Sequence, residues 1–143
     1  MAKTERSTTI AKPPEEVFPY LFDDDKVPQW TTGLQRYERL DSGPLRAGSR
    51  FHETLDVSGQ RIDGELEITR YDPPRGAESR TEVRGVDLIF TYDVQLDGAG
   101  TRLTQSVEAK GGGLKGRVLI PVIQPHLERK LEADLAALAS LLT

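Results

Sequence analysis

The 143-residue sequence contains no cysteine, a single tryptophan and no long apolar run. Without cysteine the chain can form neither disulfides nor thiolate-based metal and redox sites. No segment approaches the roughly 20 consecutive apolar residues that a transmembrane helix needs. The charged N-terminal residues are not followed by the apolar core of a secretory signal. We therefore expect a cytoplasmic protein without a membrane span.

Positive charge is also scarce, because 19 lysines and arginines are outnumbered by 23 aspartates and glutamates, which gives a net charge of −4. An acidic chain repels phosphate backbones, so nucleic-acid binding would need a local basic stripe. Lys110, Lys115 and Arg117 form one candidate stripe, but glycines separate them and no aromatic residues accompany them for base stacking. We expect no nucleic-acid partner. The oligomeric state stays open between monomer and homodimer.

Alternation of apolar and polar residues with period two dominates the middle of the chain, as is typical of half-buried antiparallel strands. The apolar face of residues 86–96 consists of Val86, Leu88, Phe90, Tyr92, Val94 and Leu96. An Asp-Gly turn follows and predicts a hairpin. The pattern predicts about seven strands. They are expected at residues 6–11, 34–40, 50–57, 60–71, 77–84, 86–96 and 101–110. The weakly apolar segment 77–84 is expected near a sheet edge.

Two short helices are predicted between the first two strands, from prolines and glutamates in residues 12–22 and from the segment that ends near Trp30. Asp23, Asp24 and Asp25 lie between them. Consecutive residues on a helix point about 100° apart, and the ligand spacing of a calcium loop is absent. We therefore expect Asp23 or Asp24 to cap the second short helix. No metal and no cofactor are expected.

The C-terminal region predicts a long amphipathic helix. From Pro125 onward, leucines recur at spacings of three and four over about five turns. An earlier helical turn, bent at Pro121 and Pro125, is possible before it. A single antiparallel sheet with one apolar face must cover that face, so this helix should lie across the sheet. Residues 1–143 are thus expected to form one α+β domain with a cavity between sheet and helix.

Four segments, in this order along the chain, resemble those of a known family: STTIAKPPEEVFPYLFDDDKVPQW (7–30), LDSGPLRAGSRF (40–51), ITRYDPPRG (68–76) and TYDVQLDGAGTRLT (91–104). The resemblance is to polyketide cyclase/dehydrase-like members of the START-like (SRPBCC) superfamily. It implies the helix-grip fold, in which a seven-stranded antiparallel sheet curls around a long C-terminal helix and leaves a hydrophobic ligand tunnel. It implies no single activity, since members include polyketide cyclases, lipid and hormone binders and chaperone co-activators.

Glu53 is a polar exception on an apolar strand face, between Phe51 and Leu55. A buried carboxylate needs a partner, a raised pKa or a wet cavity, whereas a bulge or an edge position would leave it exposed. Tyr92 and Gln105 fall on inward faces by the same counting. A carboxylate and a tyrosine in an apolar tunnel could carry protons in a cyclisation or dehydration.

The favoured interpretation is binding of a small hydrophobic molecule, such as a lipid, a polyketide or an aromatic metabolite. Trp30 lies where the family has the rim of its tunnel, and it either offers ring and N–H to a ligand or only packs. The expected ligand contacts are Trp30, Phe51, Leu55, Leu66, Phe90, Tyr92, Gln105 and Ile123. One alternative is a polyketide cyclase or dehydratase with Glu53 as proton carrier and Tyr92 as donor. Another is a protein-interaction module that uses the sheet surface.

Overall fold

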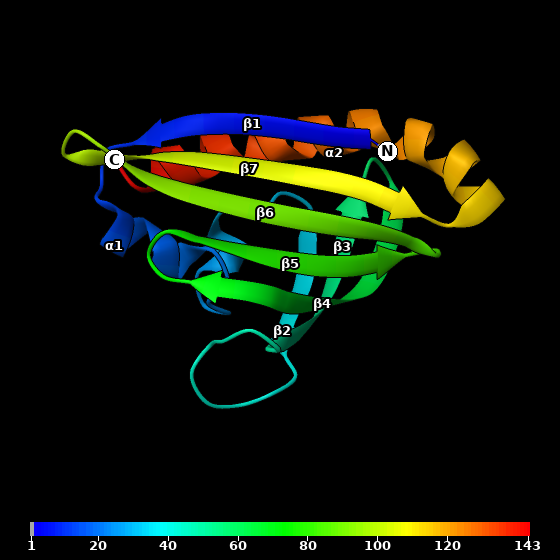
Figure 1. Cartoon of the computed structure of the whole chain (residues 1–143), viewed down its shortest axis with the longest axis horizontal. Helices are drawn as coiled ribbons and strands as arrows, with labels where there is room; N and C mark the ends of the chain where they lie inside the picture. The colour runs from blue at the N-terminus through cyan, green and yellow to red at the C-terminus, as the bar shows by residue number, and fades with distance from the viewer. Residues whose placement is uncertain (1) are drawn as a thin grey trace.

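The computed structural model describes residues 2–143 and contains one seven-stranded sheet, three short helices and one long helix (Figure 1). The elements are β1 (Ala2–Ile10), α1 (Pro14–Val17), the 3₁₀ helices η1 (Phe18–Tyr20) and η2 (Val27–Gln29), β2 (Leu34–Arg39), β3 (Arg50–Val57), β4 (Gln60–Asp72), β5 (Gly76–Val83), β6 (Val86–Asp97), β7 (Gly100–Gly111) and α2 (Gly113–Leu141).

All neighbouring strands are antiparallel, in the order β1-β7-β6-β5-β4-β3-β2. Strands β2 to β7 follow one another as a meander, and β1 returns to pair with β7 from Ala2 opposite Ala109 to Ile10 opposite Thr101. The curved sheet has α2 on its concave side (Figure 1). The helix-grip fold expected from the sequence is confirmed.

The expectation that residues 77–84 lie near a sheet edge is wrong. Strand β5 pairs with β4 on one side and β6 on the other, and the edges are β1 and β2. The buried face of β5 carries Ala77, Ser79 and Thr81, all almost inaccessible to solvent. The strand is therefore central although its buried side chains are small and only weakly apolar, whereas a central strand is usually recognised by strongly apolar residues.

Helix α2 begins at Gly113, twelve residues before the predicted start at Pro125, and it runs through both Pro121 and Pro125. Each proline removes one helical hydrogen bond, but both prolines are exposed, so water can solvate the carbonyl groups that lose a donor. Gly111, Gly112 and Gly113 all have positive φ and turn the chain sharply out of β7. Gly116 then packs so closely on the carbonyl of Gly111 that no side chain would fit there.

The core lies between the sheet and α2 in two clusters. The larger cluster joins the short helices, the sheet and the end of α2 through Phe22, Trp30, Ile68, Leu103 and Leu138, among others. The smaller one lies near the start of α2 and includes Val86, Leu88, Val107, Ala109 and Leu131. Leu96, predicted to face inward with the rest of its strand, is 70% exposed because it lies near the β6–β7 turn. No helix among residues 2–143 is long and apolar enough to cross a bilayer.

Candidate functional site

A cavity of about 60 Å³ lies between the inner face of the sheet, the segment of short helices and α2. The sheet supplies its floor, residues 21–31 one wall and residues 127–134 the other. The lining residues are Leu21, Phe22, Val27, Trp30, Thr31, Tyr37, Glu53, Leu55, Leu66, Phe90, Tyr92, Gln105, Leu127, Lys130, Leu131 and Asp134. The lining is therefore mainly apolar, with a few titratable and amide groups among the hydrocarbon side chains.

Most of the residues expected at the site lie around this single cavity. They are Trp30, Glu53, Leu55, Leu66, Phe90, Tyr92 and Gln105. Phe51 and Ile123 are not part of the lining. Phe51 is fully buried and stacks on Tyr37 with ring centroids 4.7 Å apart, and Ile123 packs against the smaller core cluster. The roles assigned to all nine residues stay predictions.

Trp30 directly follows η2 and is only 4% exposed, so its ring is part of the core as well as of the cavity wall. Its Nε1–H donates a hydrogen bond to the carbonyl oxygen of Tyr20 at 2.8 Å. This bond ties the end of η2 to the end of η1. The indole N–H is therefore already used, and Trp30 presents only its apolar ring to the cavity.

Glu53 lies on β3, between Tyr37 on β2 and Gly64 on β4 in the register of the sheet. Glu53 is half-buried, and the loss of water around its carboxylate raises its pKa from 4.5 to about 7, although the positive charge of Lys130 partly opposes this rise. Among residues 2–143 its carboxylate makes no ion pair within 4 Å. Near neutral pH this group can both hold and release a proton.

Tyr92 and Gln105 face each other on β6 and β7, and the Gln105 Nε2–H donates to the Tyr92 hydroxyl at 3.3 Å. Both side chains are buried. Burial, followed by the nearby charge of Glu53, raises the pKa of Tyr92, so its hydroxyl keeps its proton. The amide oxygen Oε1 of Gln105 has no hydrogen-bond partner within the described residues. An acceptor without a donor is therefore buried at the cavity.

Tyr37 is a second phenol at the cavity, and no sequence pattern indicated it. Its hydroxyl donates to the carbonyl oxygen of Phe22 at 3.0 Å. Burial, with a smaller contribution from Glu53, raises its pKa far above the ordinary value. Tyr37 therefore stays protonated and acts as a brace between β2 and the segment of short helices.

The most extensive polar network at the cavity was also missed from the sequence. Asp134, 3% exposed on α2, pairs with Lys130 one turn earlier at 2.8 Å. The same carboxylate accepts hydrogen bonds from the backbone N–H of Thr32 at 2.8 Å and from its hydroxyl at 2.5 Å. Lys130 donates in turn to the carbonyl oxygen of Thr32 at 3.0 Å. The segment after Trp30 is thereby fastened to α2.

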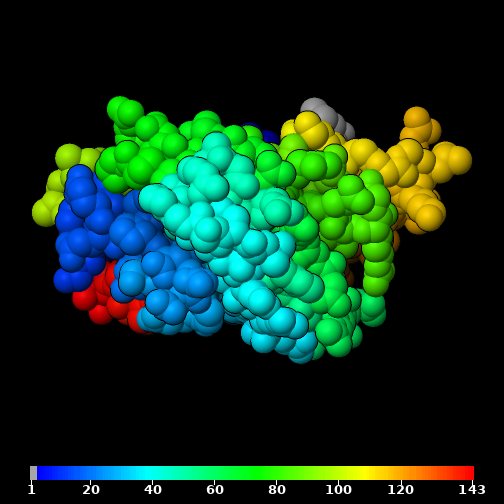
Figure 2. All heavy atoms as spheres, turned by 90° about the horizontal axis from the view of Figure 1, so that it is seen from below, coloured from blue at the N-terminus to red at the C-terminus, as the bar shows by residue number. Residues whose placement is uncertain are grey.

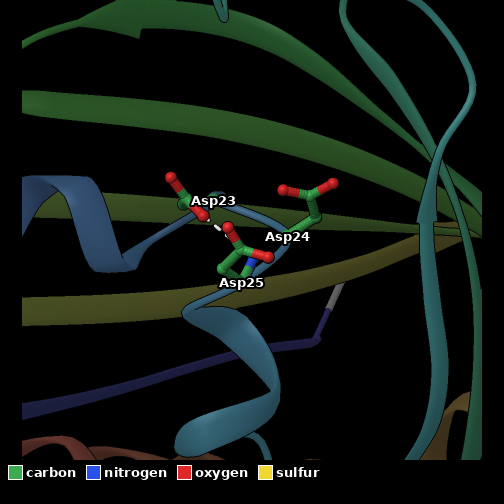
Figure 3. A group of neighbouring side chains, drawn as sticks. All are labelled: Asp23, Asp24 and Asp25. Atoms are coloured by element: carbon green, nitrogen blue, oxygen red, sulfur yellow. Dashed lines mark hydrogen bonds between the residues drawn. The ribbon is translucent and has the colours of Figure 1, made fainter.

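Asp23, Asp24 and Asp25 lie on the turn between η1 and η2 rather than on a helix (Figure 3). Oδ1 of Asp23 accepts from the backbone N–H of Asp25 at 2.9 Å, and no side chain caps η2. The prediction that Asp23 or Asp24 caps this helix is therefore wrong. Because the residues are not helical, one oxygen of each carboxylate lies within 4.8 Å of the others. Asp24 and Asp25 are exposed to water.

A family model described as polyketide cyclase/dehydrase and lipid transport matches residues 1–143. No curated protein sequence matches the chain.

Solved structures share the fold at low identity. TTHA0849 of Thermus thermophilus is 17% identical with a TM-score of 0.81, and the match covers 97% of this chain and 95% of that protein. The ZhuI aromatase/cyclase of Streptomyces sp. R1128 is 19% identical with a TM-score of 0.78, over 97% and 92% of the two chains. Ara h 8.0201 is 17% identical with a TM-score of 0.71, over 99% and 97%. Since the family model spans the whole sequence, the chain belongs to the polyketide cyclase/dehydrase and lipid transport family of the SRPBCC superfamily.

Proposed function

We propose that the cavity binds a small hydrophobic molecule that carries at least one hydroxyl group. The observation that carries this proposal is an apolar cavity with two polar groups that a ligand could contact, the carboxylate of Glu53 and the amide oxygen of Gln105. Buried polar atoms without hydrogen bonds are costly, and they are uncommon unless water or a ligand completes them.

The type of each polar atom suggests the ligand's functional group. The Gln105 Oε1 atom accepts hydrogen bonds, and so does the carboxylate of Glu53, whereas a ligand hydroxyl donates one. The raised pKa of Tyr92 keeps its hydroxyl protonated, so this group can donate to an oxygen of the ligand. Apolar surface from Trp30 and Phe90 would cover the hydrocarbon part.

The volume of the cavity limits what fits in this conformation. About 60 Å³ is well below the roughly 150 Å³ of a cavity that holds benzene, and below the roughly 300 Å³ at which pockets for drug-sized ligands begin. A ligand of a few non-hydrogen atoms fits with little rearrangement. A six-membered ring such as that of cyclohexanol already requires a small outward movement of the walls, and a lipid or a polyketide requires a larger one.

Fluorescence of Trp30 tests the proposal, because this residue is the chain's sole tryptophan and lines the cavity. Three probes transparent at 295 nm suffice: cyclohexanol, its apolar counterpart methylcyclohexane, and the longer 1-decanol. We expect cyclohexanol to change the emission and to bind at least about fivefold more tightly than methylcyclohexane, as for one net hydrogen bond. Equal affinities would contradict the hydroxyl requirement. No response to any probe, together with native mass spectra free of bound molecules, would contradict ligand binding.

A second candidate function is catalysis of a cyclisation or dehydration; the ZhuI protein, which shares the fold, is named an aromatase/cyclase. The observation that favours it is Glu53, whose pKa of about 7 suits proton transfer at neutral pH. In this mechanism Glu53 removes and returns the proton, while Tyr92 donates a hydrogen bond to the developing oxyanion.

A reactive linear poly-β-ketone, followed by absorbance and mass spectrometry, tests this second candidate. We expect wild type to accelerate formation of the cyclised product and Glu53→Gln to lower that rate at least about 100-fold. Glu65→Gln, on the neighbouring strand at an exposed position, is the matched control. An unchanged rate in Glu53→Gln removes Glu53 from the mechanism. If wild type binds the probes but does not accelerate the reaction, only the binding function remains.

A further inference from the structure

The first half of α2 carries an exposed apolar stripe. Leu114, Val118 and Val122 are 79%, 72% and 60% exposed and recur every four residues, so they lie on one face of the helix. The opposite face packs against the smaller core cluster through Ile120 and Ile123. In Figure 1 these first turns extend past the end of the sheet, and in Figure 2 they project from one end of the molecule. The stripe therefore has no covering element within residues 2–143.

Basic side chains flank this stripe on both sides. Lys115 and Arg84 share one surface hollow with Leu114, Val118 and Val122. Lys110 and Arg117 line a second hollow on the other side of the helix. None of these four cations forms an ion pair within residues 2–143.

Acidic residues are missing from this part of the sequence, although the chain as a whole has a net charge of −4, and the acidic residues on the neighbouring strands, Glu82 and Asp87, both pair with Arg80. No aspartate or glutamate occurs between Glu108 and Glu128. A local basic surface on an acidic protein selects an anionic partner. An apolar stripe between cations is the arrangement of helices that lie in the interface of an anionic bilayer.

A second copy of the chain fits this surface less well. A two-fold symmetric contact brings the same patch of both copies together. It would place Lys115 and Arg117 of one copy near the same cations of the other, and like charges at an interface oppose association.

We propose that the N-terminal half of α2 docks the protein on anionic lipid surfaces. Leu114, Val118 and Val122 enter the boundary between headgroups and acyl chains, and Arg84, Lys110, Lys115 and Arg117 contact the lipid phosphates. This function is separate from ligand binding, because the surface shares no lining residue with the cavity.

Flotation with vesicles tests the docking surface directly. The full chain is mixed with vesicles of two compositions. One is phosphatidylcholine alone, and in the other about a third of the lipid is phosphatidylglycerol. We expect binding to the anionic vesicles at least about tenfold stronger than to the neutral ones, and weaker as salt rises, because the charge contribution is screened. The triple variant Leu114→Gln/Val118→Gln/Val122→Gln should lower anionic binding at least about tenfold, as should Lys110→Gln/Lys115→Gln/Arg117→Gln.

A matched control removes one exposed apolar and one exposed basic side chain at the other end of the sheet. Leu96→Gln/Arg102→Gln changes residues beside the β6–β7 turn, and it should bind the anionic vesicles as wild type does. Equal binding to both vesicle types, or a triple variant that binds like wild type, overturns the proposal. A third result also overturns it: wild type binds no vesicles and sediments as a dimer, whereas Leu114→Gln/Val118→Gln/Val122→Gln sediments as a monomer. The stripe then serves self-association.

Discussion

Asp134 on α2 accepts a hydrogen bond from the backbone N–H of Thr32 at 2.8 Å, so one buried carboxylate fastens the loop after Trp30 to the helix. The same carboxylate balances the charge of Lys130, whose side chain is 13% exposed. Two structural elements and one buried charge therefore depend on a single side chain at the wall of the cavity.

Replacement of Asp134 by asparagine should lower the free energy of unfolding by about 2–4 kcal/mol, because Lys130 keeps its charge in a buried site without the partner. Urea unfolding at pH 7 measures the loss. Glu132→Gln is the control on the same helix, since its ion pair with Arg6 is exposed and should contribute less than about 1 kcal/mol. Equal losses in the two variants would show that the Asp134 pair adds nothing beyond a surface ion pair.

Glu53→Gln should stabilise the protein above pH 7 and leave its stability nearly unchanged at pH 4. The folded chain holds the Glu53 proton up to a pKa of about 7, whereas the unfolded chain releases it near 4.5. The folded state therefore binds more protons between these values, and wild-type stability falls as pH rises through this range. The full difference is on the order of 3 kcal/mol. Thermal unfolding of both chains from pH 4 to 8 measures it.

The exposed Glu65→Gln controls for the general effect of losing one negative charge. A stability difference between wild type and Glu53→Gln that stays constant from pH 4 to pH 8 would contradict a raised pKa.

Tyr92→Phe should weaken cyclohexanol binding about fivefold and leave methylcyclohexane unaffected, since it removes one hydrogen-bonding hydroxyl and keeps the ring. The edge-to-face contact of this ring with Phe22, at 5.5 Å between centroids, is preserved in the variant. Trp30 fluorescence titrations provide both affinities. Equal losses for the two probes would mean that the variant has changed the shape of the cavity instead of its polarity.

Leu131→Ala should widen the cavity and lower the free energy of unfolding by about 2–5 kcal/mol. Leu131 is 1% exposed and lines the wall, so its truncation leaves space that connects with the existing volume. We expect 1-decanol to bind this variant more tightly than wild type. Leu141→Ala, at a 41% exposed position of α2, should cost less than about 1 kcal/mol and leave 1-decanol binding unchanged. Unchanged 1-decanol affinity in Leu131→Ala would show that this side chain does not limit ligand size.

The sequence predicted the sheet well because its strands alternate strongly, and it failed where the physical signal is weak or misleading. Strand β5 buries Ala77, Ser79 and Thr81, which carry little hydropathy, so its central position could not be recognised. Pro121 and Pro125 argue against a helix by their chemistry, yet both lie on exposed turns of α2. Whether a proline is tolerated depends on solvation of the preceding turn, which tertiary structure decides.

Some features of the candidate site could also be predicted from the sequence, and others could not. Glu53 was found because it interrupts an alternating apolar face, and that signal is local. Lys130 and Asp134 also fall among the leucines of the helical stripe, at Leu127 plus three and plus seven, and this position could have indicated their burial. The volume of the cavity and the occupied N–H of Trp30 depend on contacts between distant segments, so no pattern within one segment contains them.

The close approach of Gly116 to Gly111 has a mechanical consequence for α2. With no side chain between them, the start of the helix lies directly against the end of β7, and the glycines at 111–113 leave the backbone of this corner free to turn. The cavity lies farther along, beside residues 127–134. We therefore expect α2 to rotate about the glycine corner when a larger molecule enters the cavity. The distal turns would then move most, and the hydrogen bond between Thr32 and Asp134 would be strained first.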